Sequence, residues 1–165
     1  MVQSCLTSNA TTSLKTGAPS PLFYQNSEYF APFSVIYFAD FFRWIEKRPL
    51  QTPVCHASLV SSLNTLFLVG GRVKCEDTGV TRNESVILQY HRAEDNWYPV
   101  TWMHTARHDL ACACIGSHLY IVGGGGAHKQ MGVCTVECFD FDNNCWVDDI
   151  ASLPRPCWGL SCTSI

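Results

Sequence analysis

Charged residues are scarce in this sequence, and neither sign dominates. Lys and Arg number 11, Asp and Glu number 14, and the net charge is −3, so charged residues make up 15% of the 165 residues. A basic surface of the kind that binds nucleic acid or an anionic membrane is therefore not expected. Apolar residues make up 47% of the chain. This share is typical of a folded domain with a buried core, here predicted to be rich in β-strands.

A targeting signal and a long apolar run are also missing. The N-terminus has neither the basic stretch nor the apolar stretch of a secretory signal peptide. The most apolar stretch, Tyr29 to Ile45, is interrupted by a proline, an aspartate and an arginine and is too short to cross a bilayer. These absences predict a soluble protein of the cytoplasm, or of the nucleus, that contacts no membrane.

Motifs of known catalytic loops are absent as well. The sequence contains no Gly-x-Ser-x-Gly and no phosphate-binding or dinucleotide-binding loop. Gly123 to Gly126 follow an expected strand but open no helix, so they predict a flexible loop. We therefore expect no enzymatic activity and no cofactor.

Cysteine, by contrast, is abundant, with ten in the chain. Without a secretory signal, disulfide bonds are not expected, and reduced, mostly buried thiols are the prediction. A zinc site is the alternative, because Cys and His are zinc ligands, but the spacing matches no zinc knuckle and no metal is expected. The residues considered for zinc are Cys112, Cys114, Cys134, Cys138, His108, His118 and His128.

An internal repeat organises the middle of the chain. Each copy has an apolar strand, a second apolar strand ending in two glycines, a third strand ending in an aromatic residue, and a tryptophan seven positions later. The diglycines lie 53 residues apart and the tryptophans 49, so the difference of four falls between diglycine and aromatic residue. An insertion confined to one loop is typical of a repeated supersecondary unit. The repeat positions are Gly70, Gly71, Tyr90 and Trp97 in the first copy and Gly123, Gly124, Phe139 and Trp146 in the second.

Each complete copy predicts four short strands. Apolar runs of four to six residues alternate with turn residues, and no 3.6-residue period is sustained. Four strands in about 50 residues indicate one blade of a β-propeller. The expected parts of the chain are a disordered Ser/Thr/Pro-rich segment (1–28), an irregular segment or second half of a degenerate repeat (29–53), two complete repeats (54–105 and 106–153) and the truncated start of a further repeat (154–165).

The diglycine after an apolar strand, the spaced aromatic residue and tryptophan, and an arginine after the last strand (Arg107, repeated as Arg155) together resemble the kelch motif. The resemblance covers residues 54–165 and extends toward 34–53, and Thr135 to Asp140 look most like the BTB–kelch (kelch-like) group. It implies an all-β fold, a partial kelch β-propeller with two complete four-stranded blades and parts of flanking blades. Because propellers close with more blades, and no BTB or BACK domain is found, we expect a fragment, a splice form, a gene-model product or part of a larger chain.

The resemblance also implies a protein–protein interaction module. The motif glycines and aromatic residues are expected to support the fold. In related kelch propellers, partners dock at one mouth of the ring, which here corresponds to loops 72–84 and 125–132 and the start of each blade. The partner-binding residues implied are His56, Arg107, His108, Asp109, Arg155 and Trp158. For the two arginines, hydrogen bonding to neighbouring loops alone is an equal alternative.

Three functions follow from the resemblance and its alternatives. Membership of the BTB–kelch group implies substrate recognition for a cullin-3 RING ubiquitin ligase, with cullin-3 bound only through a BTB domain that this sequence lacks. An actin-binding or cytoskeletal scaffold protein is the second hypothesis, and a metal-binding enzyme is the third.

Overall fold

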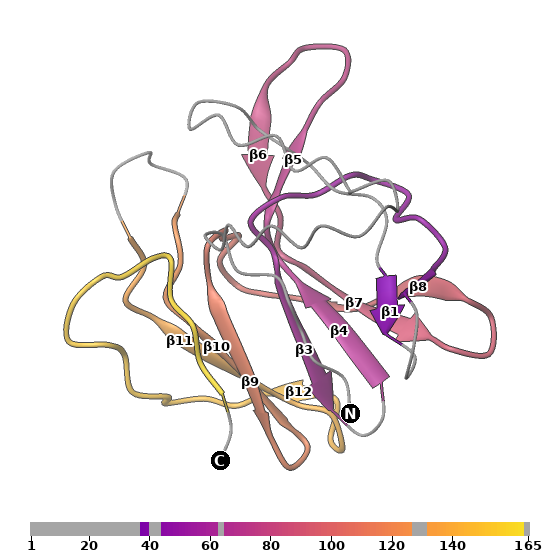
Figure 1. Cartoon of the computed structure of the whole chain (residues 1–165). Coiled ribbons are helices and arrows are strands. Elements are labelled where there is room, and N and C mark those ends of the chain that lie inside the picture. The colour runs from indigo at the N-terminus through magenta and orange to yellow at the C-terminus, as the bar shows by residue number, and fades with distance from the viewer. Residues whose placement is uncertain (1–36, 40–43, 63–64, 127–131, 164–165) are drawn as a thin grey trace, which may run out of the picture.

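The computed structural model describes residues 37–39, 44–62, 65–126 and 132–163. These residues form strands and turns without a helix, which confirms the all-β prediction (Figure 1). Correspondingly, none of the described segments is a helix long and apolar enough to cross a bilayer. The segment 1–28, expected to be disordered, lies outside the described residues.

Two four-stranded antiparallel sheets form the body of the molecule, as predicted for two blades. In each sheet the strands pair in the order in which they follow one another, apart from a hairpin inserted in the first sheet. The first sheet contains β3 (Ser58–Ser62), β4 (Thr65–Val69), β7 (Val86–His91) and β8 (Asn96–Trp102). The second sheet contains β9 (Ala111–Ile115), β10 (His118–Val122), β11 (Val136–Asp140) and β12 (Cys145–Trp146).

Two short hairpins complete the described strands. β1 (Tyr37–Ala39) pairs with β2 (Trp44–Glu46), within the range where half of a degenerate repeat is expected. β5 (Arg72–Lys74) pairs with β6 (Thr81–Asn83) and projects from the end of the first sheet (Figure 1). This hairpin stands where the first repeat is longer than the second, and the stretch expected to be a loop contains two paired strands.

The aromatic residue and the tryptophan of each repeat are cross-strand partners. Tyr90 pairs with Trp97, and Phe139 pairs with Trp146. The ring centroids lie 5.1 Å apart in both pairs. The turns between them place Asp95 and Asn144 in the left-handed region, with φ of 48° and 52°. Asp and Asn tolerate this backbone better than most residues, which is why the seven-residue spacing closes a hairpin.

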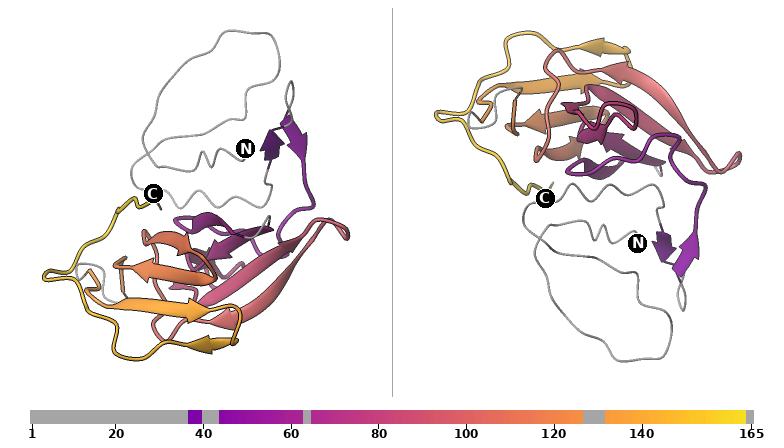
Figure 2. Two further views of the ribbon diagram at one scale, coloured as in Figure 1. Left: turned by 90° about the horizontal axis from the view of Figure 1, so that it is seen from below. Right: turned by 90° about the horizontal axis from the view of Figure 1, so that it is seen from above.

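The two sheets pack face to face around one apolar core. Side chains from β4 and β7 meet side chains from β9, β10 and β11, and the first strands β3 and β9 contact each other. Figure 2 shows the two sheets side by side as ribbons. Phe67 stacks on Phe141, with ring centroids 4.4 Å apart. The most deeply buried members of this core are Val69, Ile87, Leu119, Ile121 and Phe139.

A second core covers the opposite face of the first sheet. Leu50 and Val54, which precede the sheet in the chain, pack with Leu68, Tyr90 and Trp97. The first sheet is therefore buried on both faces. Among the described residues, the second sheet contributes side chains to the core between the sheets and not to the second core.

The diglycines end β4 and β10 with the same backbone conformation. Gly70 and Gly123 both have φ of 61°, and the glycines that follow them have φ of 103° and 102°. A Cβ atom at Gly70 would lie 2.6 Å from the carbonyl oxygen of Arg107, and one at Gly123 would lie 2.7 Å from that of Cys157. Only glycine combines this conformation with so close a backbone approach, so these positions hold the sheets to the segments that follow them.

Candidate partner-binding rim

The starts of successive repeats are joined by a ladder of backbone hydrogen bonds. The backbone N–H of Asp109 donates to the carbonyl oxygen of His56 at 2.9 Å, and that of Gly159 donates to the carbonyl oxygen of Asp109 at 2.9 Å. The three residues share left-handed backbone, with φ of 55°, 50° and 67°. They are therefore one repeat position, and two of its three occupants adopt a conformation that side chains rarely take.

The side chains of this position form an ion pair between the two sheets. His56 Nδ1 lies 2.7 Å from Asp109 Oδ1, and His108 Nε2 lies 3.7 Å from Asp109 Oδ2. The hydrogen bond to Asp109 raises the pKa of His56 to about 10. Burial raises the pKa of Asp109, but the His56 hydrogen bond and the nearby His108 and Arg72 bring it below its ordinary value. His56 is therefore a cation at neutral pH, and it is 42% exposed.

His108 and Trp158 immediately precede two of the ladder residues, and each packs on a glycine. A Cβ atom at Gly125 would overlap the His108 ring, and one at Gly132 would lie 2.7 Å from the Trp158 ring. Burial lowers the pKa of His108, so this imidazole is neutral. Trp158 is 57% exposed despite its size. A large exposed aromatic beside a charged pair is typical of an interaction surface.

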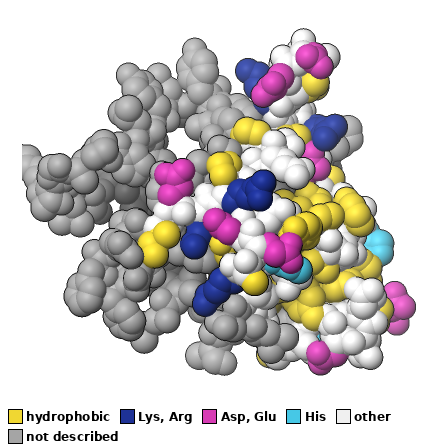
Figure 3. Space-filling model, turned by 90° about the vertical axis from the view of Figure 1, so that its right-hand side faces the viewer, with side chains coloured by type: hydrophobic (Ala, Val, Ile, Leu, Met, Phe, Trp, Pro, Cys, Tyr) yellow, Lys and Arg dark blue, Asp and Glu magenta, His cyan; other side chains and the backbone are white. Residues whose placement is uncertain are grey.

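The projecting β5–β6 hairpin is tied to the same region. The Asn83 side chain donates to the carbonyl oxygens of Gly125 at 3.2 Å and Gly126 at 2.9 Å. Loop 72–84 is thereby connected to the start of loop 125–132, of which residues 127–131 lie outside the described ranges. Figure 3 shows acidic, basic and apolar side chains together on the projecting part, which presents a mixed surface. We call His56, His108, Asp109, Trp158 and this hairpin the rim.

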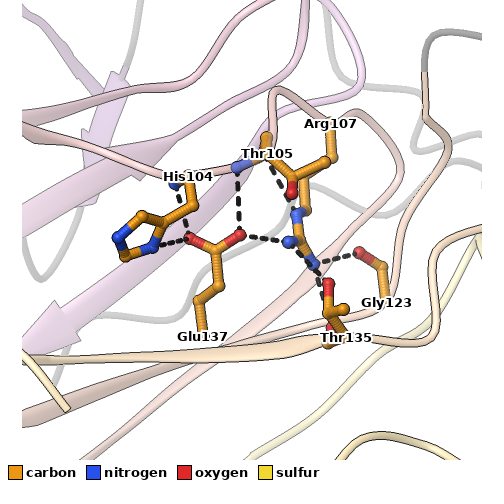
Figure 4. Close-up of polar contacts among 6 residues, drawn as sticks. All are labelled: His104, Thr105, Arg107, Gly123, Thr135 and Glu137. Carbon is orange, nitrogen blue, oxygen red and sulfur yellow. Dashed lines mark hydrogen bonds and ion pairs between the residues drawn. The ribbon is translucent and has the colours of Figure 1, made fainter. Parts of the chain in front are cut away.

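Arg107 lies beneath the rim and is fully buried, with 0% exposed. Its guanidinium donates to the carbonyl oxygens of Gly123 and Thr135, each at 3.0 Å, and to Thr135 Oγ1 at 3.0 Å (Figure 4). It also forms an ion pair with Glu137. Its backbone carbonyl accepts from Gly71 of the first sheet at 2.9 Å. These contacts are internal and connect both sheets, so Arg107 positions the structure under the rim.

Glu137 completes this buried network from strand β11. Its carboxylate accepts from the backbone N–H groups of His104 at 2.8 Å and Thr105 at 3.1 Å, in addition to Arg107. His104 Nδ1 lies 3.3 Å from the same carboxylate. Every charge in the network thus has a partner, which is the condition for keeping an ion pair inside a protein.

Arg155 does not repeat the position of Arg107, which corrects the expected alignment of the third repeat. The backbone N–H of Gly71 donates to the carbonyl oxygen of Arg107. At the equivalent position of the second repeat, the backbone N–H of Gly124 donates to the carbonyl oxygen of Cys157 at 2.8 Å. Cys157 is therefore the equivalent of Arg107, and Arg155 is an exposed residue just before it. Leu153 is the equivalent of Met103, because its backbone N–H donates to Cys134 as that of Met103 donates to Ser85. Arg107 comes four residues after Met103, whereas Arg155 comes only two after Leu153, so Arg155 falls short of the equivalent position.

The sequence residues are thus placed in two groups. His56, His108 and Asp109 are brought into contact, and Trp158 adjoins them through the ladder residue that follows it. Arg107 is buried below. Asn83 and Glu137, which complete the arrangement, were not found from the sequence, because an isolated Asn in a loop and a Glu within a strand carry no spacing signal.

The cysteines are free thiols in the described part of the chain. Three are buried, three half-buried and three exposed, so the expectation of mostly buried thiols is only partly met. Burial raises the pKa of Cys112 and Cys138, which keeps these two protonated and unreactive. Within the same described ranges, no three His, Cys, Asp or Glu side chains are grouped so that they could hold a metal ion.

Comparisons with known proteins agree with this repeat. A family model described as Kelch motif matches residues 106–148, which include the whole second sheet. Kelch-like protein 26 of Danio rerio is 25% identical over 74% of the chain, and human Kelch repeat and BTB domain-containing protein 12 is 27% identical over 76%. Alpha-scruin of Limulus polyphemus is 25% identical over 76% of the chain.

The likeness covers only part of each relative. The chain spans 20%, 21% and 14% of the lengths of these three proteins. A solved structure titled "Structure of YjhT" superposes with a TM-score of 0.59 over 71% of the chain and 51% of its own length, at 13% identity, which speaks for the fold alone. The chain thus carries kelch-type repeats, and its two sheets are blades of a partial β-propeller.

Proposed function

We propose that the chain is a protein–protein interaction module that binds its partner at the rim. The observation that carries the proposal is the ladder position. The position requires a left-handed backbone, which a glycine such as Gly159 adopts without strain. His56 and Asp109 adopt the same backbone at the equivalent positions although their side chains make it strained. Strained residues that the fold does not require concentrate at functional sites. The neighbouring exposed Trp158 supplies the large apolar contact that binding hot spots use.

The finer proposal is substrate recognition for a cullin-3 ubiquitin ligase. Its support is the similarity to kelch-like proteins and to a protein whose name includes a BTB domain. In such an assembly the rim would hold the substrate, and cullin-3 would be bound through a BTB domain. Alpha-scruin among the relatives supports the second candidate, an actin-binding scaffold.

The rim is tested by a pair of tryptophans with matched exposure. Trp158 is 57% exposed at the rim, and Trp102 is 58% exposed at the end of the outermost strand β8. Proteins captured from a cell lysate by the wild-type chain are quantified against those captured by Trp158→Ala and by Trp102→Ala. We expect at least one protein that Trp102→Ala retains and that Trp158→Ala loses by about tenfold or more. Equal capture by both variants would remove the rim from the proposal.

Two assays separate the candidate classes. Co-sedimentation with actin filaments tests the scaffold, and co-precipitation of cullin-3 by a full-length relative carrying these repeats tests the adaptor. Filament binding that Trp158→Ala abolishes, without cullin-3, favours the scaffold. Cullin-3 association without filament binding favours the adaptor.

A further inference from the structure

The carboxylate of Asp109 is surrounded by three basic side chains at the rim. His56 Nδ1 lies 2.7 Å from Asp109 Oδ1, and His108 Nε2 lies 3.7 Å from Asp109 Oδ2. The two imidazole rings meet edge to face, with centroids 6.2 Å apart. The Arg72 guanidinium attracts the same carboxylate. We call His56, Arg72 and His108 the cradle, because together they hold a carboxylate in this structure.

The fold does not require that carboxylate. Asp109 stands at the second position of the backbone ladder, and Gly159 stands at the third with the same left-handed backbone and no side chain. The ladder itself joins backbone atoms only. The side chains of His56 and Asp109 are 42% and 24% exposed, and ion pairs so open to water contribute little to stability. The Asp109 side chain can therefore leave the cradle while the ladder stays intact.

Asp109 also fits the cradle incompletely, since its backbone is held by the ladder. The 3.7 Å between His108 Nε2 and Asp109 Oδ2 exceeds the length of a hydrogen bond. Two nitrogen atoms of the cradle, Arg72 Nε and His108 Nδ1, are buried without a hydrogen-bond partner in the part of the chain that the structure describes. Buried polar atoms are normally paired. The cradle thus has hydrogen-bonding capacity that its own carboxylate leaves unused.

The charges of the cradle indicate which ligand it suits. His56 is protonated beside Asp109, and Arg72 carries a permanent positive charge. Burial lowers the pKa of His108, so this ring contributes a neutral imidazole. A carboxylate from outside would replace one negative charge by another, and it would not be tied to the ladder. It can therefore approach the donors more closely than Asp109 does.

We propose that Asp109 is an internal pseudo-ligand of the rim, and that a carboxylate of the bound partner takes its place on His56 and Arg72. The aspartate occupies the cradle when no partner is present and competes with the partner when one binds. The inference rests on the proposed function, because it takes the rim as the place where the partner binds. It gives the partner an exposed Asp or Glu, and it gives Asp109 the role of lowering the affinity.

The test compares two replacements of Asp109 that differ in whether they empty the cradle. Asp109→Gly follows the example of Gly159 on the ladder and leaves the cradle empty. Asp109→Asn tolerates the left-handed backbone and fills the cradle with a neutral group of nearly the same shape. Both variants and the wild type are titrated with acetate at constant ionic strength, and the imidazole signals of His56 are followed by NMR. His91, outside the rim and also 42% exposed, is the internal reference.

Acetate should bind to Asp109→Gly saturably, with a Kd of about 1–10 mM, and at least about tenfold more weakly to the wild type and to Asp109→Asn. In Asp109→Gly the pKa of His56 should fall toward its ordinary value of about 6.5 and rise again as acetate fills the cradle. Arg72→Leu, added to Asp109→Gly, should weaken acetate binding by about tenfold. The signals of His91 should respond alike in all proteins. No saturable shift of His56 in Asp109→Gly, or an equal shift in Asp109→Asn, would overturn the pseudo-ligand.

Three further probes identify the class of ligand. N-acetylglutamate amide should bind to Asp109→Gly about as well as acetate, whereas N-acetylglutamine amide, which lacks the charge, should not shift His56. Inorganic phosphate should bind no more tightly than acetate. Phosphate that binds at least about tenfold more tightly would overturn the assignment of a carboxylate.

The comparison of Trp158→Ala with Trp102→Ala tests the rim separately. A partner lost by Trp158→Ala, together with no acetate binding to Asp109→Gly, would refute the exchange of carboxylates and leave the rim as the binding surface. Acetate binding, together with equal capture by both tryptophan variants, would keep the cradle as an anion site and overturn its assignment to a partner. The two proposals can therefore fail independently.

Discussion

The two faces of the first sheet meet their neighbours with opposite chemistry at the same repeat positions. On the face toward residues 50–54, Val54 and Leu88 lie in an apolar cluster with Tyr90 and Trp97. On the face toward the second sheet, the equivalent positions hold Arg107 and Glu137, fully or almost fully buried. Both arrangements build a closely packed junction, so the fold itself does not require the charges.

This difference indicates that the ion pair serves selection more than stability. Replacing a buried ion pair by apolar residues is often neutral or stabilising, whereas removing one partner is strongly destabilising. An apolar junction accepts many neighbours. A charged one rejects any neighbour that lacks the opposite charge, and polar interface groups are known to specify pairing in this way. The predictions below break or sharpen the comparison, beginning with the largest expected effect.

Removing one charge of the Arg107–Glu137 pair should have the largest effect. In Arg107→Leu, Glu137 keeps two backbone donors but loses its counter-charge inside the protein. We expect a loss of about 3–5 kcal/mol in the free energy of unfolding, measured by urea denaturation. The double variant Arg107→Leu/Glu137→Leu copies the chemistry of Val54 and Leu88 and should recover most of that loss.

Arg155 supplies the matched control for that measurement. It is exposed, and Arg155→Leu should change the free energy of unfolding by no more than about 0.5 kcal/mol. If the double variant is as unstable as Arg107→Leu alone, the two junctions are not interchangeable and the selection argument fails.

Glycine substitutions separate backbone strain from contact between sheets and give a smaller effect. Gly70 and Gly116 have nearly equal φ, 61° and 60°, but a Cβ at Gly70 would meet the Arg107 carbonyl at 2.6 Å, whereas one at Gly116 would meet nothing within 4 Å. Gly116→Ala should lose about 1 kcal/mol from strain alone. Gly70→Ala should lose at least about 2 kcal/mol, because the junction must also move apart. Thermal unfolding of the two variants at one pH provides the comparison, and equal losses would show that the close approach at Gly70 does not matter.

The smallest expected effect is the pH dependence of the rim ion pair. The pKa of His56 is raised, so its contribution to stability is complete below the unfolded value of about 6.5 and disappears as pH rises toward 10. The lowered pKa of Asp109 makes its contribution disappear on acidification below about 4. His56→Asn retains a residue that tolerates the left-handed backbone and removes the charge.

The gap in stability between the wild type and His56→Asn should therefore be greatest between about pH 4 and 6.5 and close toward pH 10. Because His56 is 42% exposed, the gap should not exceed about 1 kcal/mol. Melting curves at several pH values measure it, and a gap that widens from pH 6.5 to 9 would contradict the pairing.

The sequence predicts the sheets well because their signals are local. The seven-residue spacing specifies a hairpin that closes on Tyr90 and Trp97 or on Phe139 and Trp146, and this register is confirmed. The four residues by which the first repeat is longer were expected in a loop, and they lie within the stretch that forms the β5–β6 hairpin. Short polar strands such as Thr81–Asn83 carry no apolar alternation from which they could be recognised.

The rim is less accessible to sequence reasoning because it depends on contacts between repeats. His56 and Asp109 occupy equivalent positions, but a histidine and an aspartate show no likeness that would align them. The left-handed backbone they share with Gly159 appears only in the folded chain. The misplacement of Arg155 has the same origin, since the equivalence of Cys157 and Arg107 rests on which carbonyl a distant glycine contacts.

The ladder at positions 56, 109 and 159 also bears on how such a surface can change over time. Its hydrogen bonds join backbone N–H groups to backbone carbonyl oxygens, so they can form whichever side chain stands at each position. A cation, an anion and a glycine already occupy three successive rungs. If the rim is where a partner binds, as we propose, substitutions at these positions would change its specificity while the backbone ladder between the repeats is kept.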